Sequence, residues 1–485
     1  MKFLKEHRPE IIIGAFGIVT YIISLANTFH TDDWLVLNLM HDGFSWSDFL
    51  SMENLARFRP LTNIFVYLRY LMFGDTALGY YALNILLHAF FATLLYRFLL
   101  NIGLKQKLAL LSAMIFAVYF QHYEAILWLY GTIRILAAIF WVASLWALYD
   151  YLIFGKRNAL IAFALFSFFG YFVVEDFVVS PLGFLIFALL IRGGNDSTKS
   201  ALGWRIWWPV FISFLGLAIY AILRTALIVR PGVVEDYYYF GPHIIGRLIA
   251  YFEWMMLPPP DHAYFQAFAA RLNPAIRLIW KVSSLTSITA LIIVGLYAII
   301  KAPRAIKFMT VFILIGLIPA LPLNYKVTSR NLYIPSIGLS VLLGFIFLTL
   351  YERIKGRGWQ RAVAYVFLMV YFCVNIIGVW VTAHEYRKNQ TMVASLVEDL
   401  RGSRLDLNKY EYILLDHLPG RTVVGPAMIY KLGFYHEVIA SNDPSAPGPI
   451  DIARAAGEVA STNKPFIVFD YRDGHLKEAT SEYLR

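Results

Sequence analysis

The stretch EIIIGAFGIVTYIISLANTFHTDD, residues 10–33, runs from an apolar segment directly into two adjacent aspartates. No charged residue lies between Ile11 and Asn27, and the segment is long enough to cross a hydrocarbon core of about 30 Å as a helix. It exceeds the usual apolar region of a cleaved signal peptide, about 7 to 15 residues, and no clear cleavage site follows. We therefore expect a retained membrane helix that ends close to Asp32 and Asp33.

The rest of the chain has the composition of a polytopic membrane protein. Of its 485 residues, 59% are hydrophobic and 15% are charged, whereas soluble domains carry about 25% charged residues. Because lipid offers backbone amides no hydrogen-bond partner, the recurring apolar runs are predicted to be helices. We predict an α-helical protein with about eleven transmembrane helices. They are roughly residues 10–27, 77–100, 108–121, 133–153, 158–173, 176–191, 206–226, 278–300, 308–323, 334–351 and 362–382.

Positive charge follows a regular pattern along these spans. Lysine and arginine occur before the first span and in every second connection after it, as in Lys105 to Lys107 and Arg353 to Arg361. Cytoplasmic loops of membrane proteins carry this excess. The N-terminus is therefore expected in the cytoplasm and the C-terminus outside. The net charge of +10 is explained by this asymmetry, and we expect no nucleic-acid partner.

The chain divides into two predicted domains. Residues 1–383 form the transmembrane domain, with external loops at 28–76 and 228–277, and residues 384–485 have the composition of a soluble external α/β domain. Buried strands of that domain are predicted at YEYILLD, residues 410–416, and PFIVFDYRD, residues 465–473. Trp34 and its amphipathic neighbours in the first loop suit helices that lie along the membrane interface.

Acidic residues gather at or near the external face. The candidates are Asp32, Asp33, Glu124, Glu175 and Asp176. A partly desolvated carboxylate near cations can act as a general base toward a hydroxyl, and its neighbour can orient the acceptor or bind a divalent metal. The local alternative for the aspartate pair is capping of the helix that follows. A single acid at a span end also needs no function, because it reaches water by snorkelling.

Basic residues accompany these acids. They are Arg59, Arg134, Lys326 and Arg330. Arginine forks match phosphate oxygens, so the group predicts a site for a phosphorylated lipid headgroup. The alternative is that these cations pair with neighbouring carboxylates as structural ion pairs. Asn84 and His88, four residues apart on one helix face, are interpreted as hydrogen-bonding partners of other helices. No Walker loop, HExxH, GxSxG or CxxC motif is present.

Four stretches taken together resemble a known family. FRPLTNIFVYLRYLMFGDTALGYYALNILLHAF, FAVYFQHYEAILWLYGTIRILAA, VVEDFVVSP and SRNLYIPSIGLSVLLG resemble successive motifs of GT-C membrane glycosyltransferases. The similarity is closest to the transmembrane O-mannosyltransferases that carry tetratricopeptide repeats and to their bacterial relatives. It covers about residues 10 to 350, and it rests on the order and spacing of the motifs.

The resemblance implies an inverting transferase that uses a polyprenyl-phosphate sugar at the external face of a bacterial or archaeal cell membrane. It implies that Asp32, or Asp33, is the catalytic base and that Glu124 and Glu175 are further acids of the family pattern. It also matches Arg59 and Arg330 to family arginines. A protein, a glycolipid or a polysaccharide remains open as the acceptor.

This chain also departs from the family pattern. It reads GTIR after the Glu124 motif, has Val174 before Glu175 and lacks the repeats. Two other functions stay open from the residues themselves. A lipid or solute transporter would place charges near the middle of the membrane, and a non-catalytic scaffold would tolerate replacement of the first-loop acids.

Overall fold

The computed structural model describes most of the chain. The described residues are 7–29, 32–41, 58–192, 199–227, 238–256, 272–323, 327–354, 358–403, 405–418, 425–432, 437–441, 450–472 and 475–483. They form two compact units. The membrane unit comprises Met1–Leu25, Ser45–Arg69 and Gly79–Thr382, and the C-terminal unit comprises Ala26–Phe44, Tyr70–Leu78 and Ala383–Arg485.

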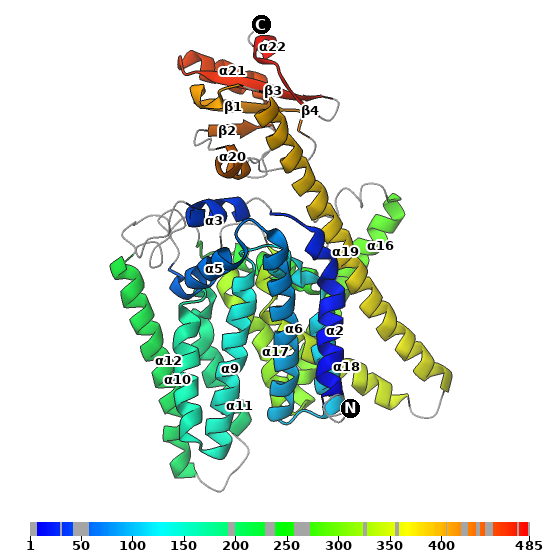
Figure 1. Ribbon diagram of the computed structural model, residues 1–485. Helices are drawn as coiled ribbons and strands as arrows, with labels where there is room; N and C mark the ends of the chain where they lie inside the picture. The colour runs from blue at the N-terminus through cyan, green and yellow to red at the C-terminus, as the bar shows by residue number, and fades with distance from the viewer. Residues whose placement is uncertain are drawn as a thin grey trace. The chain divides into compact units, whose positions relative to one another are not determined.

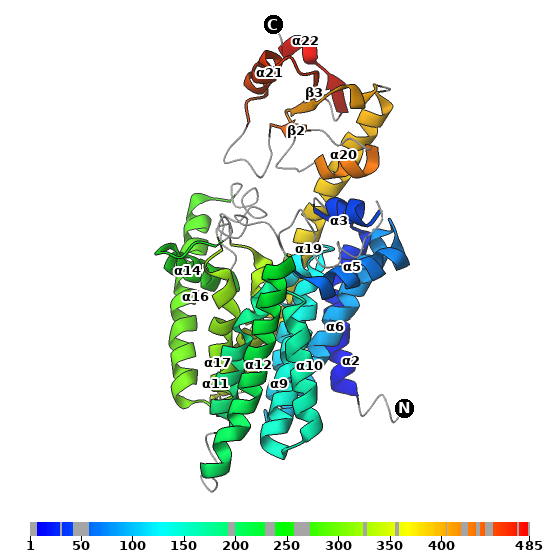
Figure 2. The same cartoon turned by 90° about the vertical axis from the view of Figure 1, so that its left-hand side faces the viewer.

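Helices build the membrane unit, and many of the longer ones run side by side (Figures 1 and 2). In chain order they are α2 (Arg8–Tyr21), α5 (Pro60–Phe73), α6 (Ala77–Asn101), α7 (Gln106–Val118), α8 (Tyr123–Ile126), α9 (Thr132–Phe154), α10 (Arg157–Tyr171), α11 (Ser180–Arg192), α12 (Lys199–Leu227), α14 (His243–Met256), α16 (Pro274–Lys301), α17 (Arg304–Leu317), α18 (Pro335–Arg353) and α19 (Gly358–Gly402). Short 3₁₀ turns join them: η1 (Ile22–Ala26), η2 (Phe120–His122), η3 (Glu175–Val179), η4 (Ile318–Ala320) and η5 (Ser329–Leu332).

Every predicted span contains a helix, but the count of eleven membrane crossings is not confirmed. Among the described residues, seven helices are long and apolar enough to cross a membrane, or eight if the bent pair Gln106–Val118 and Phe120–Ile126 forms one span. Helices α10, α11 and α17 have 15, 13 and 14 residues. At 1.5 Å per residue they reach about 20 Å, short of the hydrocarbon thickness. The chain is nevertheless an integral membrane protein by its apolar helices.

Small residues allow helices of this unit to approach closely. A Cβ added at Gly338 of α18 would lie 2.1 Å from the backbone oxygen of Met309 on α17, so only glycine fits there. Glycine at such positions is typical of helix contacts in membranes, where close backbone packing replaces the hydrophobic effect. The α17–α18 pair therefore holds η5, which directly precedes α18, in a fixed place.

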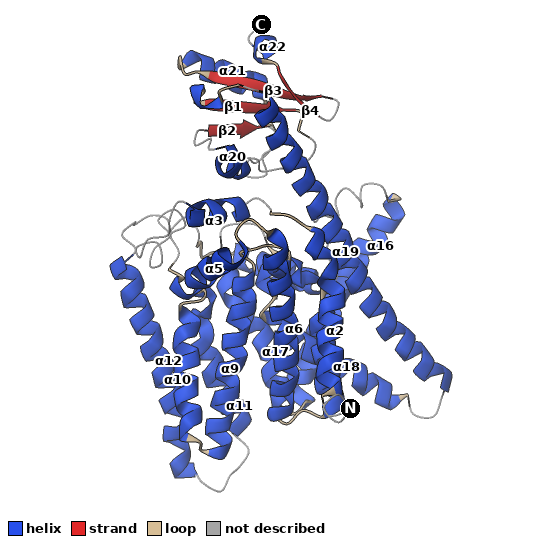
Figure 3. Ribbon diagram, viewed as in Figure 1, coloured by secondary structure: helices blue, strands red, loops and turns tan. Residues whose placement is uncertain are grey.

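The C-terminal unit contains the strands of the described chain, as Figure 3 shows. Strands β1 (Tyr412–Asp416), β2 (Glu437–Ala440), β3 (Phe466–Arg472) and β4 (His475–Glu478) pair in the order β2-β1-β3-β4. The first three are parallel and β4 is antiparallel to β3. Helices α20 (Gly425–Leu432), α21 (Ile452–Ser461) and α22 (Thr480–Tyr483) and the turn η6 (Leu407–Lys409) complete it. The predicted strands at 410–416 and 465–473 and the α/β class are confirmed.

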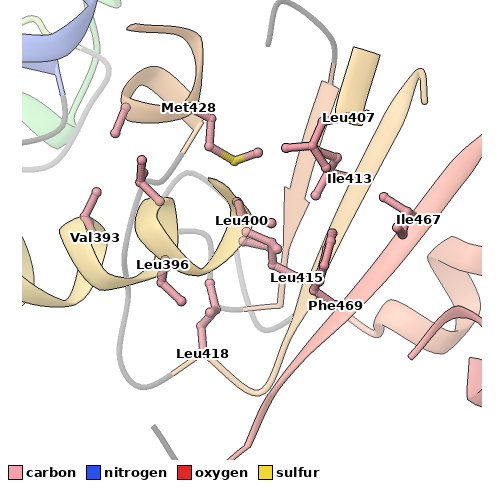
Figure 4. Packing of buried hydrophobic residues seen from close by; sticks show 13 residues of the cluster. Val393, Leu396, Leu400, Leu407, Ile413, Leu415, Leu418, Met428, Ile467 and Phe469 are labelled. Atoms are coloured by element: carbon pink, nitrogen blue, oxygen red, sulfur yellow. The ribbon is translucent and has the colours of Figure 1, made fainter. Parts of the chain in front are cut away.

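Two helices differ from the sequence prediction. Helix α19 runs for 45 residues without a break, well past the predicted end of the last span at residue 382. Its last turns carry Val393, Leu396 and Leu400, which pack with Ile413 and Phe469 in the core of the C-terminal unit (Figure 4). Helix α3 (Asp32–His41) also belongs to the C-terminal unit. Trp34 packs against this same core, and the expectation that α3 lies along the membrane interface stays a prediction.

Candidate active site

Arg59 and Glu175 form a buried ion pair at one end of the membrane unit. Arg59 directly precedes α5, and Glu175 begins η3, between α10 and α11. Nε and Nη2 of Arg59 lie 2.6 and 2.5 Å from Oε2 of Glu175. The exposed fractions are 5% and 9%. Burial alone would lower the pKa of Arg59, but attraction to the Glu175 carboxylate outweighs it and raises that pKa, so the guanidinium stays charged.

A second arginine joins two further elements at the same end. Arg134, in the first turn of α9, forms an ion pair with Asp176 of η3 through Nη1. Its Nη2 donates to Oδ1 of Asn331 in η5 at 3.0 Å, and Nδ2 of Asn331 donates to the Tyr251 hydroxyl at 2.8 Å. Four segments distant in sequence are therefore tied together. Asn331 and Tyr251 are members of the site that the sequence prediction did not single out.

Glu124 and Arg330 form the accessible part of the cluster. Oε2 of Glu124 accepts a hydrogen bond of 2.9 Å from the backbone amide of Arg330. The Arg330 guanidinium carbon lies 4.9 Å from the centre of the Trp128 ring, in cation–π contact. All three residues are half-buried, whereas Arg59 and Arg134 are buried. Arg330 is therefore the most accessible of the three arginines.

A fully buried arginine supports the turn that carries Glu124 and Trp128. Nη1 of Arg69 donates to Leu129 O at 3.1 Å and to Thr132 Oγ1 at 2.9 Å. Its Nη2 donates to Asn84 Oδ1 at 3.1 Å. A Cβ added at Gly131 would lie 2.3 Å from Glu124 O, so the turn closes only around glycine. The sequence signal for Arg69 is a single charged residue within the otherwise uncharged stretch of α5.

Asn84 and His88 of α6 form hydrogen bonds with other helices, as predicted. Nδ2 of Asn84 donates to the carbonyl of Ile126 at 3.0 Å. The ring nitrogens of His88 lie 2.8 Å from the Tyr333 hydroxyl and 3.0 Å from Ala117 O. Both side chains are fully buried. They fix the elements behind the cluster and have no surface from which to reach a substrate.

The predicted catalytic aspartates lie in the C-terminal unit. Helix α3 begins at Asp32, and both acids occupy its first turn, where the helix dipole favours negative charge. Asp33 has an exposed fraction of 0%. The side chain of Asp32 and the whole of Lys326 lie outside the described residues. A role of the pair in starting the helix is compatible with a catalytic role.

The structure thus brings Arg59, Glu175, Arg134, Asp176, Glu124 and Arg330 into one cluster within the membrane unit. In the part of the chain that the structure describes, no group of three or more His, Cys, Asp or Glu side chains is arranged to hold a metal ion. Two arginines of the cluster are paired with acids, as the alternative of structural ion pairs requires.

Known proteins were compared by sequence and by fold. Neither protein-family profiles nor curated protein sequences give a match. Solved structures do: the apo form of the Archaeoglobus fulgidus oligosaccharyltransferase, a GT-C enzyme, superposes with a TM-score of 0.54. The match has 12% sequence identity and covers 97% of this chain and 70% of that chain. This chain has the GT-C fold.

Two further structures of the same archaeal enzyme agree. Its complex with Zn and sulfate gives a TM-score of 0.56 at 11% identity, over 95% of this chain and 67% of that chain. Its complex with an inhibitory peptide and a dolichol-phosphate gives 0.54 at 12% identity, over 96% and 70%. The GT-C resemblance seen in the sequence motifs is confirmed at the level of the fold.

Proposed function

We propose that this chain is an integral-membrane glycosyltransferase that moves a sugar from a polyprenyl-phosphate donor to an acceptor hydroxyl at the external membrane face. The observation that carries the proposal is the polar cluster at one end of an apolar GT-C helical unit, with Glu124 and Arg330 accessible. The archaeal oligosaccharyltransferase was solved with a dolichol-phosphate, which supports a donor of that lipid class. The pattern of positive loops supports the external location.

Arg330 is the proposed ligand of the donor phosphate. Its backbone amide is held by Glu124 and its guanidinium lies against Trp128, so the side chain is positioned before the donor arrives. A positioned cation stabilises the charge that develops on the departing phosphate. Arg59 and Arg134 were predicted for the same role. Because each is already engaged by a carboxylate, we assign them to holding η3 and η5 in place.

The proposed role of Lys326 in binding the donor phosphate rests on the sequence alone. The supporting acids take structural parts: Glu124 fixes η5, and Glu175 and Asp176 neutralise the buried arginines. Because these acids pair with Arg59 and Arg134, neither buried arginine is left as an unpaired charge, which would be strongly destabilising.

Asp32 is the proposed general base, and Asp33 orients it. Asp33 has no exposed surface, which supports Asp32 as the residue that touches the acceptor. In the proposed step the acceptor oxygen attacks the anomeric carbon from the face opposite the phosphate. Its proton passes to the Asp32 carboxylate, and the bond from the anomeric carbon to the phosphate oxygen breaks with its electron pair on the phosphate. The configuration at the anomeric carbon inverts.

The acceptor is proposed only as a class: a hydroxyl of an exported protein, a glycolipid or a surface polysaccharide. Purified protein in liposomes, mixed with radiolabelled undecaprenyl-phosphate sugars and membrane extract, tests the function. We expect wild type to transfer label and Asp32→Asn to lose transfer by about 10²-fold or more, the contribution typical of a general base. Parallel reactions with and without a chelator test the metal requirement.

Asp150→Asn is the matched control. Asp150 is an acid near the other end of α9, paired with Lys156 at 3.4 Å, and it lies outside the cluster. We expect this variant to transfer sugar at the wild-type rate. Equal rates for wild type, Asp32→Asn and Asp33→Asn would exclude the proposed mechanism. Transport of the labelled lipid without any transfer would favour the flippase alternative.

A further inference from the structure

The helix that carries the acid pair is packed on the C-terminal unit. Helix α3 lies against α20, and the Trp34 side chain covers the hydrophobic core formed by α19, α20 and the sheet. Nζ of Lys431 on α20 lies 5.2 Å from the centre of the Trp34 ring, and the Phe29 ring meets Trp34 edge to face at 5.2 Å. The tryptophan is therefore partly buried against aromatic, cationic and aliphatic groups of one unit.

The chain entering α3 is tied to α19. The backbone amide of Thr28 donates to Oε1 of Gln390 at 2.8 Å, and Nε of Arg387 lies 3.5 Å from Oδ1 of Asn27. Gln390 and Asn27 are each 3% exposed. Arg387 and Gln390 are three residues apart, so they share one face of α19. The chain that leads into α3 is thus held by Arg387 and the buried Gln390 of α19.

The same helix is part of the domain core. Leu396 and Leu400 of α19 pack with Leu415 and Phe469 of the sheet, as Figure 4 shows. Helix α3 has only 10 residues, and isolated helices shorter than about 12 to 15 residues are marginal in water. Its position therefore depends on the surface beneath it. That surface is built by α19, α20 and the sheet of the C-terminal unit.

We propose that the C-terminal domain is the positioning element of the catalytic acid pair. The inference rests on the proposed function of Asp32 and Asp33. The domain then acts on the reaction through Trp34 and Gln390, and this role does not depend on its binding an acceptor. A general base must keep its geometry within a fraction of an ångström, and a displacement of about 1 Å costs about 10²-fold in rate. Trp34 and Gln390 are positioning residues and do not touch substrate.

Trp34→Ala and Gln390→Ala test the proposal in the full-length protein. Hydrogen exchange followed by mass spectrometry should show faster exchange in peptides covering Asp32–His41, with unchanged exchange in Thr132–Phe154. In transfer assays with an undecaprenyl-phosphate sugar, we expect kcat to fall by about 10- to 100-fold. The donor KM should stay within about twofold, because the proposed phosphate ligands belong to the other unit. Trp34→Phe should recover most of kcat.

Arg454→Ala is the control for the domain surface. Arg454 lies on α21, is exposed and pairs with Glu458 one turn further along the same helix, so this variant should match wild type in exchange and rate. Faster exchange of α3 with unchanged kcat would overturn the positioning role. Unchanged exchange in Trp34→Ala would overturn the anchoring itself. Absence of transfer by wild type would refute the proposed function instead, and the exchange measurement would still decide whether the domain anchors α3.

Discussion

Replacement of Glu175 by glutamine tests the assignment of Arg59 as a structural cation. The substitution keeps the shape of the side chain and removes its charge, so Arg59 is left charged and buried. Both Nε and Nη2 of Arg59 contact the same Glu175 oxygen, and with 5% of Arg59 exposed, water cannot replace that carboxylate. Breaking a buried pair in this way costs about 3–5 kcal/mol.

The double variant Arg59→Met with Glu175→Met should behave differently. It removes both charges together, and such replacement of buried pairs by apolar residues is often neutral. We expect it within about 1–2 kcal/mol of wild type, and therefore more stable than Glu175→Gln. For comparison, Asp150→Asn removes the charge that pairs at 3.4 Å with the exposed Lys156 and should change the free energy of unfolding by less than about 1 kcal/mol.

Unfolding by SDS in mixed micelles, followed by tryptophan fluorescence, gives these free energies. A loss below about 1 kcal/mol for Glu175→Gln, or a double variant as unstable as the single one, would refute the structural pairing. The same proteins test function. If Arg59 binds the donor phosphate directly, the double variant folds but its donor KM rises as much as that of Arg330→Ala. We expect the increase only for Arg330→Ala.

Three further outcomes are expected. Arg330→Ala should raise the donor KM by about tenfold or more, since a hydrogen bond to a charged group contributes about 1.5–3 kcal/mol, and Arg330→Lys should recover part of the loss in the same kinetic assay. Gly131→Ala should lower the unfolding midpoint and the transfer rate together, because its Cβ meets the Glu124 carbonyl. The hydrogen bond with Asp470 raises the pKa of His417 above its usual value near 6.5, so its stabilising contribution is complete below pH 6.5 and is lost as pH rises through the raised pKa. The difference in unfolding midpoint between wild type and His417→Gln should therefore shrink from pH 6 to pH 9, and a constant difference would contradict this origin.

The helical architecture was predictable from the sequence because a chain segment in lipid must satisfy its backbone hydrogen bonds internally. An apolar run in a membrane has one way to satisfy its backbone, so the predicted ranges coincide with helices even where, as in α17, the helix is too short to span. The strands β1 and β3 were also predictable from their continuous apolar runs. Whether a short helix crosses the bilayer depends on its neighbours, which spacing along one chain does not reveal.

The continuation of α19 beyond the membrane span is indicated by the spacing of its apolar residues, although the composition there is that of a soluble segment. Val393, Leu396, Val397 and Leu400 recur at helical spacing, but charged residues before them resemble the end of a membrane span. The docking of α3 had no comparable signal. A tryptophan beside acids suits the membrane interface and a domain surface equally, and the contact with Lys431 depends on tertiary structure that the local sequence does not reveal.

The six charged residues of the cluster were named from the sequence, but their pairings were not. The sequence predicted that acids and arginines share one face. Their pairings depend on the turns η3 and η5, whose backbone places Glu175 beside Arg59 and Asn331 beside Arg134. Arg69 was missed because its partners are backbone carbonyls and neutral side chains, which leave no charge pattern in the sequence.

The lipid product of the reaction tests the central claim most directly. Purified wild-type protein is given an undecaprenyl-phosphate sugar with separate labels in lipid and sugar, and the released lipid is identified by mass spectrometry. We predict undecaprenyl phosphate in a one-to-one ratio with transferred sugar, and neither product with Asp32→Asn. Transfer without release of the lipid phosphate, or full release and transfer by Asp32→Asn, would contradict the account.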